Sequence, residues 1–240
     1  MRRNTVYRVS GGCHAFLQGR MGSRRLPGKT LMKIQGHSIL ERAISRLRAS
    51  PVVDAVVVLT TRGREDDAIA AECKRLNVPF YRGSEDDVLA RFYEAAEIFK
   101  PEIVIRATAD NPLIEIGSLE RIVTALRTSD LDYCMEKDLP YGAATEAMTA
   151  AALARTHTAA VEPLHREHVT LYMKEHPDKF RISLLSPPIA VRRPDFRVTV
   201  DTPEDFANME RLIGCFPDRD INRPLEDYFA VCSAIKTDYA

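Results

Sequence analysis

Hydrophobic and polar residues follow two patterns along the chain. Short apolar runs rich in β-branched residues predict strands, and longer stretches with apolar residues every three or four positions predict amphipathic helices. The predicted strands are residues 14–18, 52–60, 78–81, 103–106, 133–135, 181–185 and 197–200. The predicted helices are residues 38–47, 65–76, 86–99, 118–127, 147–156, 163–174, 203–213 and 225–235.

This alternation of strands and helices predicts the α/β class, with a mostly parallel central sheet and helices on both faces. We expect an N-terminal extension over residues 1–12 and one domain over residues 13–240, with a less regular excursion at about 131–195. Ligands of such sheets bind at the carboxyl ends of the strands. Residues that directly follow a predicted strand are therefore the first candidates for a site.

Composition narrows the function classes. The 240 residues include 34 Lys and Arg and 34 Asp and Glu, so the formal net charge is zero and any phosphate binding must be local. The five cysteines are scattered without a Cys-x-x-Cys pair, which argues against a disulfide framework and against a zinc site. No stretch predicts a signal peptide or a membrane span, and we expect a cytoplasmic protein.

A glycine-rich basic loop follows the first predicted strand. Residues 19–30 read Gly-Arg-Met-Gly-Ser-Arg-Arg-Leu-Pro-Gly-Lys-Thr. Glycine lets backbone N–H groups approach an anion, and Arg and Lys supply charge, so the loop suits a polyphosphate. It is not the P-loop of NTPases, because that motif requires Gly at the position of Ser23. A solvated basic loop is the alternative.

Two aspartates lie at predicted strand ends that are far apart in sequence. Asp110 follows the strand at 103–106, and Asp201 follows the strand at 197–200. Two such carboxylates suit Mg²⁺, which takes few protein ligands and completes its shell with phosphate oxygens and water. The alternative is structural: Asp201 caps the next helix and Asp110 begins a turn.

The segment Gln-x-Arg-Met-Gly-Ser-x-Arg-Leu-Pro-Gly-Lys at 18–29 resembles the opening motif of the CMP-sugar synthetases. These are the cytidylyltransferases for acylneuraminate and 3-deoxy-manno-octulosonate, and the chain looks closest to their spore-coat polysaccharide biosynthesis branch. The resemblance runs from about residue 16 to 213 and includes Val-Asp-Thr-Pro-Glu-Asp at 200–205. It implies a Rossmann-like fold of the nucleotide-diphospho-sugar transferase type, often as a homodimer.

The resemblance also implies a reaction and a set of site residues. The reaction is a Mg²⁺-dependent transfer of CMP from CTP to a sugar acid or related acceptor, with release of pyrophosphate, for surface polysaccharide or glycoconjugate synthesis. The expected catalytic residues are Lys29, Arg25, Asp110 and Asp201, of which Asp110 and Asp201 would bind Mg²⁺. The expected nucleotide-binding residues are Gln18, Gly19, Arg20, Gly22, Ser23, Arg25, Lys29, Thr60, Asp67 and Arg106. The expected acceptor-binding residues are Glu146, Arg166, Glu167 and His168.

The chain departs from the family pattern at four positions. Gly19 stands where Ala is usual, Arg24 where a small residue is usual, and Ala109 where Gly is usual. Ala144 replaces an expected Asp near the acceptor-binding residues, which leaves the identity of the acceptor open.

Residues 82–91, Arg-Gly-Ser-Glu-Asp-Asp-Val-Leu-Ala-Arg, also resemble a segment of the spore-coat branch. A turn before a helix with acidic residues in its first turn accounts for this segment as well as a ligand site does. The pair His165 and His168 is spaced for zinc, but no third ligand has suitable spacing.

Two other function classes remain open. A glycosyltransferase that consumes a nucleotide sugar would need an Asp-x-Asp metal motif at the end of a strand, and the candidate Asp130-Leu131-Asp132 precedes a predicted strand instead of following one. A non-catalytic nucleotide-binding module is compatible with the substitutions at Gly19, Ala109 and Ala144.

Overall fold

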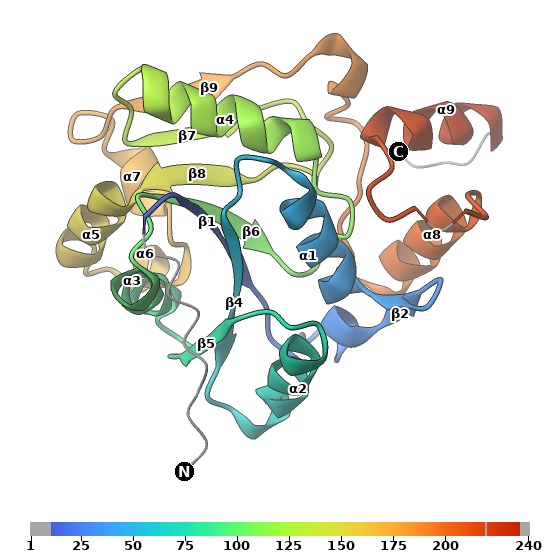
Figure 1. Ribbon diagram of the computed structural model, residues 1–240, viewed down its shortest axis with the longest axis horizontal. Helices are drawn as coiled ribbons and strands as arrows, with labels where there is room; N and C mark the ends of the chain where they lie inside the picture. The colour runs from blue at the N-terminus through green and yellow to red at the C-terminus, as the bar shows by residue number, and fades with distance from the viewer. Residues whose placement is uncertain (1–10, 219, 236–240) are drawn as a thin grey trace.

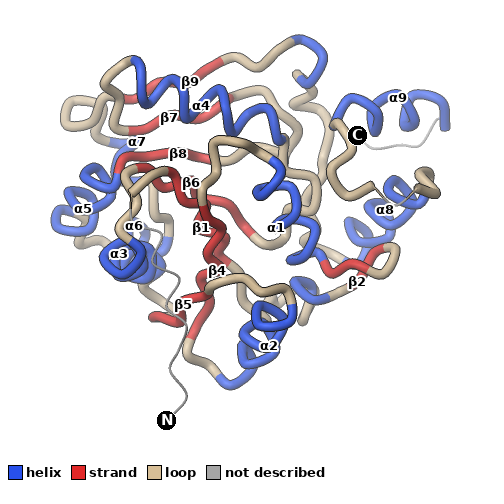
Figure 2. The backbone as a smooth tube through the Cα atoms, viewed as in Figure 1, coloured by secondary structure: helices blue, strands red, loops and turns tan. Residues whose placement is uncertain are grey.

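The computed structural model describes residues 11–218 and 220–235 and has one central sheet (Figures 1 and 2). Its strand order is β5-β4-β1-β6-β8-β7-β9. All neighbouring strands pair in parallel except β8, which is antiparallel to both β6 and β7. The strand bounds are β1 Cys13–Gln18, β4 Ala55–Thr61, β5 Phe80–Gly83, β6 Ile103–Thr108, β7 Tyr133–Glu136, β8 Glu146–Thr149 and β9 Ile182–Leu185. The fold is thus the expected α/β class with a mostly parallel sheet.

Helices cover both faces of this sheet (Figure 1). The α-helices are α1 Ile39–Ala49, α2 Asp67–Arg75, α3 Val88–Phe99, α4 Ile116–Thr128, α5 Ala150–Ala159, α6 Pro163–Glu167, α7 Leu171–Glu175, α8 Pro203–Gly214 and α9 Leu225–Ile235. Short 3₁₀ helices span Lys29–Leu31, Arg64–Asp66 and Ile189–Val191, and a small antiparallel pair is formed by β2 Lys33–Ile34 and β3 His37–Ser38.

Alternate side chains of the buried strands pack into two hydrophobic cores on opposite faces of the sheet. On one face, Ala15 and Leu17 of β1 belong to a cluster with residues of α1, α2 and α4. On the other face, Phe16 belongs to a cluster with residues of α3, α5 and α7. A third cluster joins α8 and α9 to β2. Strands that are apolar on both sides therefore lie in the centre of the sheet, as their continuous apolar runs predict.

Capping side chains determine where two helices near the site begin. The Ser38 hydroxyl accepts a hydrogen bond from the backbone N–H of Glu41 at the start of α1. At α8, Thr202 and Asp205 form a capping box, and Pro203 occupies the first helical position. Both helices start where the sequence predicts.

Several predicted bounds are wrong. Residues 197–200 form no strand: a single bridge joins Arg197 to Tyr141, and the residues from there to Asp201 have no regular secondary structure. The helix predicted over 147–156 begins only at Ala150, because Glu146–Thr149 pair as β8 between β6 and β7. The helix predicted over 163–174 is divided into α6 and α7 at residues 168–170.

Within the described ranges, no helix has the length and apolar character needed to cross a bilayer. Cys13, Cys73, Cys134 and Cys215 are free thiols. The predicted N-terminal extension, residues 1–12, lies outside the described residues except for its last two positions.

Candidate active site

A large cavity opens at the carboxyl ends of β1 and β6. Its volume is about 1050 Å³, and a second hollow of about 490 Å³ shares much of its wall. The basic loop, defined as residues 19–30, lines both hollows together with the ends of β1 and β6. This is the edge of the sheet at which parallel α/β proteins bind ligands.

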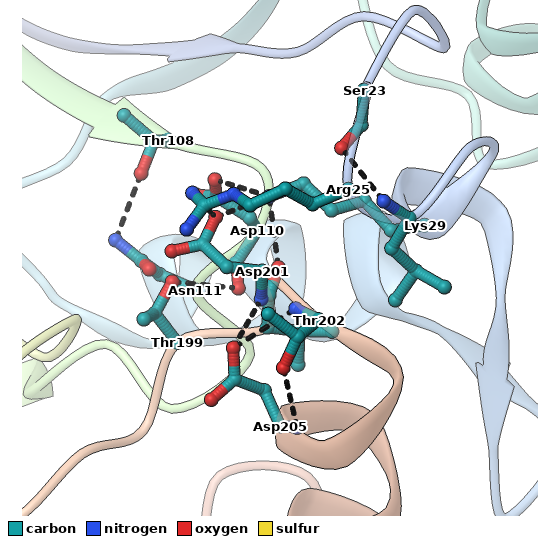
Figure 3. Close-up of polar contacts among 12 residues, drawn as sticks. Ser23, Arg25, Lys29, Thr108, Asp110, Asn111, Thr199, Asp201, Thr202 and Asp205 are labelled. Atoms are coloured by element: carbon teal, nitrogen blue, oxygen red, sulfur yellow. Dashed lines mark hydrogen bonds and ion pairs between the residues drawn. The ribbon is translucent and has the colours of Figure 1, made fainter.

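Lys29, Asp110 and Asp201 come together in the wall of the second hollow (Figure 3), and the two aspartates also line the large cavity. The Lys29 Nζ donates hydrogen bonds to Asp110 Oδ2 at 2.9 Å, to Asp201 Oδ1 at 2.8 Å and to the carbonyl oxygen of Val200 at 2.8 Å. The Lys29 side chain is 10% exposed and that of Asp201 13%, whereas that of Asp110 is 28% exposed. Three groups remote in sequence therefore form one partly buried charge cluster that faces the cavity.

Arginines surround the Asp201 carboxylate on its other sides. Arg25 lies 3.0 Å from Asp201 Oδ1, and Arg197 donates to Asp201 Oδ2 at 2.8 Å (Figure 3 shows Arg25). Although partial burial opposes ionisation, Lys29, Arg25 and Arg197 hold the pKa of Asp201 below its ordinary value. Asp205 accepts hydrogen bonds from Arg197 and from the backbone N–H groups of Asp201 and Thr202, and its pKa is about 2 despite its partial burial. Both carboxylates therefore remain charged at neutral pH.

The basic loop is held in shape by hydrogen bonds at its two ends. The backbone N–H of Met21 donates to Asp66 Oδ1 at 2.7 Å, and the Thr30 hydroxyl donates to the carbonyl of Arg20 at 3.0 Å. Gly28 has a φ of 75° in the turn that leads into Lys29, a conformation that favours glycine. Asp66, which is fully buried, also accepts a hydrogen bond from the backbone N–H of Thr61 and thus links the loop to the end of β4.

Two departures from the family pattern lie in contact with each other. A Cβ atom added at Gly19 would lie 2.7 Å from the Cβ of Ala109. The backbone of both residues is fixed, because Gly19 N–H donates to the Leu59 carbonyl and Ala109 N–H donates to the Gln18 carbonyl. The space at this point holds one methyl group, so Gly19 and Ala109 compensate for each other.

Most of the predicted site residues face the cavity. Those in the walls of the two hollows are Gln18, Gly19, Arg20, Gly22, Ser23, Arg25, Lys29, Arg106, Asp110, Glu167, His168 and Asp201. The sequence-based list therefore describes one connected surface, assembled from β1, the basic loop, β6, α6 and the segment before α8.

Four predicted residues lie outside the walls of both hollows. Thr60 is fully buried in β4, and Asp67 is an exposed residue of α2 whose carboxylate pairs with Arg82. Arg166 pairs with Asp87 and so ties α6 to the start of α3. Glu146 is buried in β8. Thr60, Asp67, Arg166 and Glu146 therefore do not line the two hollows, and their contacts with nucleotide or acceptor stay predictions.

Arg91 is a cavity residue that the sequence analysis did not single out. It is only 3% exposed, yet it lines both hollows. The Arg91 Nη1 donates a hydrogen bond to the Ser84 carbonyl at 2.7 Å. Among the described residues, no group accepts a hydrogen bond from Arg91 Nε, and no carboxylate lies within ion-pair distance of the Arg91 guanidinium. Burial lowers the pKa of Arg91, and the nearby charge of Arg20 lowers it further. In the sequence, only the place of Arg91 in residues 82–91, which resemble a segment of the spore-coat branch, indicated a functional role.

Other polar residues complete the wall. They are Arg24, Glu85, Asp86, Thr108, Asn111, Glu136, Lys137, Asp138, Tyr141 and Thr199. Most belong to loops after strands, whose side-chain directions cannot be read from hydrophobic periodicity.

The donor set of Asp110 and Asp201 fits a hard divalent cation. Two carboxylates from different segments approach one cationic group, and one of them is partly exposed to a cavity large enough for a polyphosphate. In the described part of the chain, no three His, Cys, Asp or Glu side chains gather into a metal-binding group, so a cation held here needs further ligands from substrate and water. His165 contacts Glu175 at 2.7 Å, whereas His168 faces the cavity, and the two do not converge as zinc ligands.

The Asp-x-Asp candidate lies away from this site. Asp132 accepts a hydrogen bond from the backbone N–H of Arg181 and also pairs with Arg155. Because it precedes β7, which runs parallel to β6, it lies at the opposite edge of the sheet from Asp110.

Comparison with known proteins gives four related findings. Residues 15–231 match the family model described as cytidylyltransferase. An uncharacterized protein of Methanocaldococcus jannaschii, MJ1063, is 40% identical over 191 residues, 80% of this chain and 79% of that protein. The spore coat polysaccharide biosynthesis protein SpsF of Bacillus subtilis is 35% identical over 202 residues, 82% of this chain and 84% of SpsF. A solved structure of a cytidylyltransferase from Leptospira borgpetersenii superposes with a TM-score of 0.84 at 27% identity and covers 95% of each chain.

Proposed function

Because the chain belongs to the cytidylyltransferase family, we propose that it transfers CMP from CTP to an oxygen of a sugar-acid acceptor and releases pyrophosphate. The observation that supports this reaction most directly is the Lys29 ammonium between Asp110 and Asp201, at the base of the basic loop. A site for nucleotidyl transfer needs cationic groups for the leaving pyrophosphate next to carboxylates that can hold a metal ion. Both occur in one cavity.

In this mechanism, the chain positions and neutralises the triphosphate. The loop side chains Arg20, Arg24 and Arg25 are exposed and line the cavity, so they can close on the β- and γ-phosphates. Lys29 is buried and held by three acceptors, so it supplies a fixed positive charge at the base of the loop. Alignment of the reacting groups and stabilisation of the developing charge then account for the rate.

Asp110 and Asp201 are the residues that would hold Mg²⁺. When bound, the ion would polarise the phosphate and increase the acidity of the attacking oxygen. Lys29 and Arg197 keep the Asp201 carboxylate ionised and oriented for this role.

Measurement of pyrophosphate release tests the proposal. Wild-type protein is incubated with each of the four NTPs, Mg²⁺ and a panel of sugar acids, and we expect release with CTP. Asp201→Ala and Asp110→Ala should lower turnover by at least about 100-fold, since each removes a group that acts on the transition state. Asp195→Ala is the matched control, because among the described residues that exposed carboxylate pairs only with Arg193. Unchanged turnover in Asp201→Ala would refute the metal assignment.

The relationship to SpsF supports a role in surface polysaccharide or glycoconjugate synthesis. A glycosyltransferase that uses the same cavity is disfavoured, because the Asp-x-Asp candidate lies at the other edge of the sheet.

The free cysteines suit a reducing compartment, and we assign the enzyme to the cytoplasm.

A homodimer is part of the proposal. The edge strand β9 has an exposed Leu184, and Ile189 just after it is 85% exposed. Apolar residues on an open sheet edge favour association with a second copy. Sedimentation of wild type and of Ile189→Asp tests this, and a monomeric wild type would contradict it.

A further inference from the structure

A side chamber opens beside the large cavity, between the sheet and helices α6 and α7. Its volume is about 380 Å³, and it shares Arg106 and His168 with the wall of the large cavity. Leu164 and Leu171 supply an apolar wall, and Lys174 of α7 lies at its rim with a side chain that is 40% exposed. The chamber therefore combines two cationic groups with an apolar surface.

The two cations are organised by one buried carboxylate, Glu146. Its Oε2 accepts a hydrogen bond from Arg106 Nη1 at 2.5 Å, and its Oε1 pairs with Lys174. Oε1 also accepts hydrogen bonds from the Tyr133 hydroxyl at 2.6 Å and from the Thr170 hydroxyl at 2.9 Å. Glu146 thus fixes both cations in place, and its two carboxylate oxygens already have four hydrogen-bonding partners.

The pKa of Glu146 fits this arrangement. Although burial opposes ionisation, the charges of Arg106 and Lys174 lower the pKa of Glu146 to about 2. One negative charge therefore faces two positive charges, which leaves one positive charge uncompensated at the chamber. Among the described residues, no group accepts a hydrogen bond from Arg106 Nε, which is buried.

We propose that this chamber binds the carboxylate of the acceptor, with Arg106 and Lys174 as its charged partners. The inference rests on the proposed function and assigns Arg106 to the acceptor instead of the nucleotide. The single excess positive charge of the chamber matches an anion of one negative charge. A phosphate dianion would be repelled by the Glu146 carboxylate, and Arg106 and Lys174, which already pair with Glu146, would offer it too few free N–H donors.

The same geometry orients the rest of the acceptor. Arg106 and Thr108 lie two residues apart on β6, roughly 7 Å along the strand, and both line the large cavity. An acceptor whose carboxylate lies at Arg106 therefore extends its ring past Thr108 toward Asp110. Arg106 and Lys174 would then select acidic sugars over neutral ones.

Calorimetric titration of the full-length protein tests the chamber. The probes are 3-deoxy-manno-octulosonate, N-acetylneuraminate and the methyl ester of each, titrated in the presence of CTP and Ca²⁺ to limit turnover. We expect at least one acid to bind wild type and its ester to bind at least 10-fold more weakly. Lys174→Gln should weaken binding of the acid at least 10-fold and leave binding of CTP unchanged, and Lys174→Arg should retain binding.

Lys179→Gln is the matched control, because Lys179 lies outside the chamber and carries the same charge. Three results would overturn the inference: neither acid binds wild type, acid and ester bind equally, or Lys174→Gln binds the acid as tightly as wild type. The CTP titration keeps the two proposals apart. If wild type binds no CTP, the proposed function fails; if it binds CTP but no acid, only the inference about the chamber fails.

Discussion

The contact between Gly19 and Ala109 predicts that two substitutions, each harmful alone, will rescue each other. Gly19→Ala adds a methyl group 2.7 Å from the Cβ of Ala109, well inside van der Waals contact. Neither Cβ can rotate away, and both backbones are fixed by hydrogen bonds to neighbouring strands. Overpacking of this kind costs about 1–3 kcal/mol.

The reverse change, Ala109→Gly, also destabilises the protein. It removes a buried methyl group, worth about 0.8 kcal/mol, and adds backbone freedom in the unfolded chain, worth about 0.5–1 kcal/mol. The double variant Gly19→Ala with Ala109→Gly moves the methyl group across the contact without removing it. We expect its free energy of unfolding to lie within about 1 kcal/mol of wild type, with a coupling of about 2 kcal/mol between the sites.

Urea denaturation of the four proteins measures this cycle, and the CTP-induced shift of the melting temperature shows whether the cavity keeps its shape. Gly214→Ala is the matched control, because no atom of the described part of the chain lies within 4 Å of a Cβ at Gly214 and the residue ends α8. The reasoning is refuted if the double variant is as unstable as the sum of the single variants, or if Gly19→Ala unfolds like wild type.

Three further predictions concern buried charges. Asp66→Asn should loosen the basic loop, because it disrupts the hydrogen bond from the backbone N–H of Met21. CTP titrations should then show binding about 10-fold weaker than in wild type. Asp67→Asn is the control and should bind CTP like wild type, because Asp67 is exposed and pairs with Arg82. Folding lowers the pKa of Glu146 from 4.5 to about 2, so the stabilisation by its carboxylate is complete above pH 4.5 and is lost as the pH falls toward 2. In urea titrations over this range, the free energy of unfolding of wild type should fall by about 3 kcal/mol more than that of Glu146→Gln. Parallel pH dependences of the two proteins would contradict this. Arg91→Met should weaken CTP binding at least 10-fold and leave the melting temperature of the free protein equal or higher, because it removes a buried charge that pairs with no carboxylate of the described residues. A large drop in melting temperature would assign Arg91 a structural role.

The sequence predicts the central architecture because buried strands and amphipathic helices leave strong periodic signals. β1, β4 and β6 and the helices that cover them fall close to their predicted positions. β8 was missed because its four residues, Glu146–Thr149, lead directly into an alanine-rich helix, and helix propensity masks so short a strand. The segment 197–200 reads as a strand because Val198 and Val200 are buried, but they pack in the third core without a strand partner.

The site could be predicted where residues follow strands, and not where a role depends on a side chain's direction. Asp110 and Asp201 are marked by their positions, and the structure brings them together with Lys29. Asp66 and Asp67 are adjacent and chemically identical in sequence, yet one is buried against the basic loop and the other is exposed. Only the packing of α2 on the sheet decides between them.

Two charge clusters, one built on a shared lysine and the other on a shared carboxylate, account for the local anion binding that we propose for a chain of zero net charge. In the first, Asp110 and Asp201 share Lys29, and Arg25 and Arg197 add charge from the outside. In the second, a single carboxylate, Glu146, is shared by Arg106 and Lys174. The first cluster thus presents carboxylate oxygens for a cation beside a basic loop, and the second leaves a positive charge for an anion. Since β6 carries Arg106 and leads to Asp110, the strand fixes the spacing between the two clusters, and the acceptor that we propose would have to match that spacing to react.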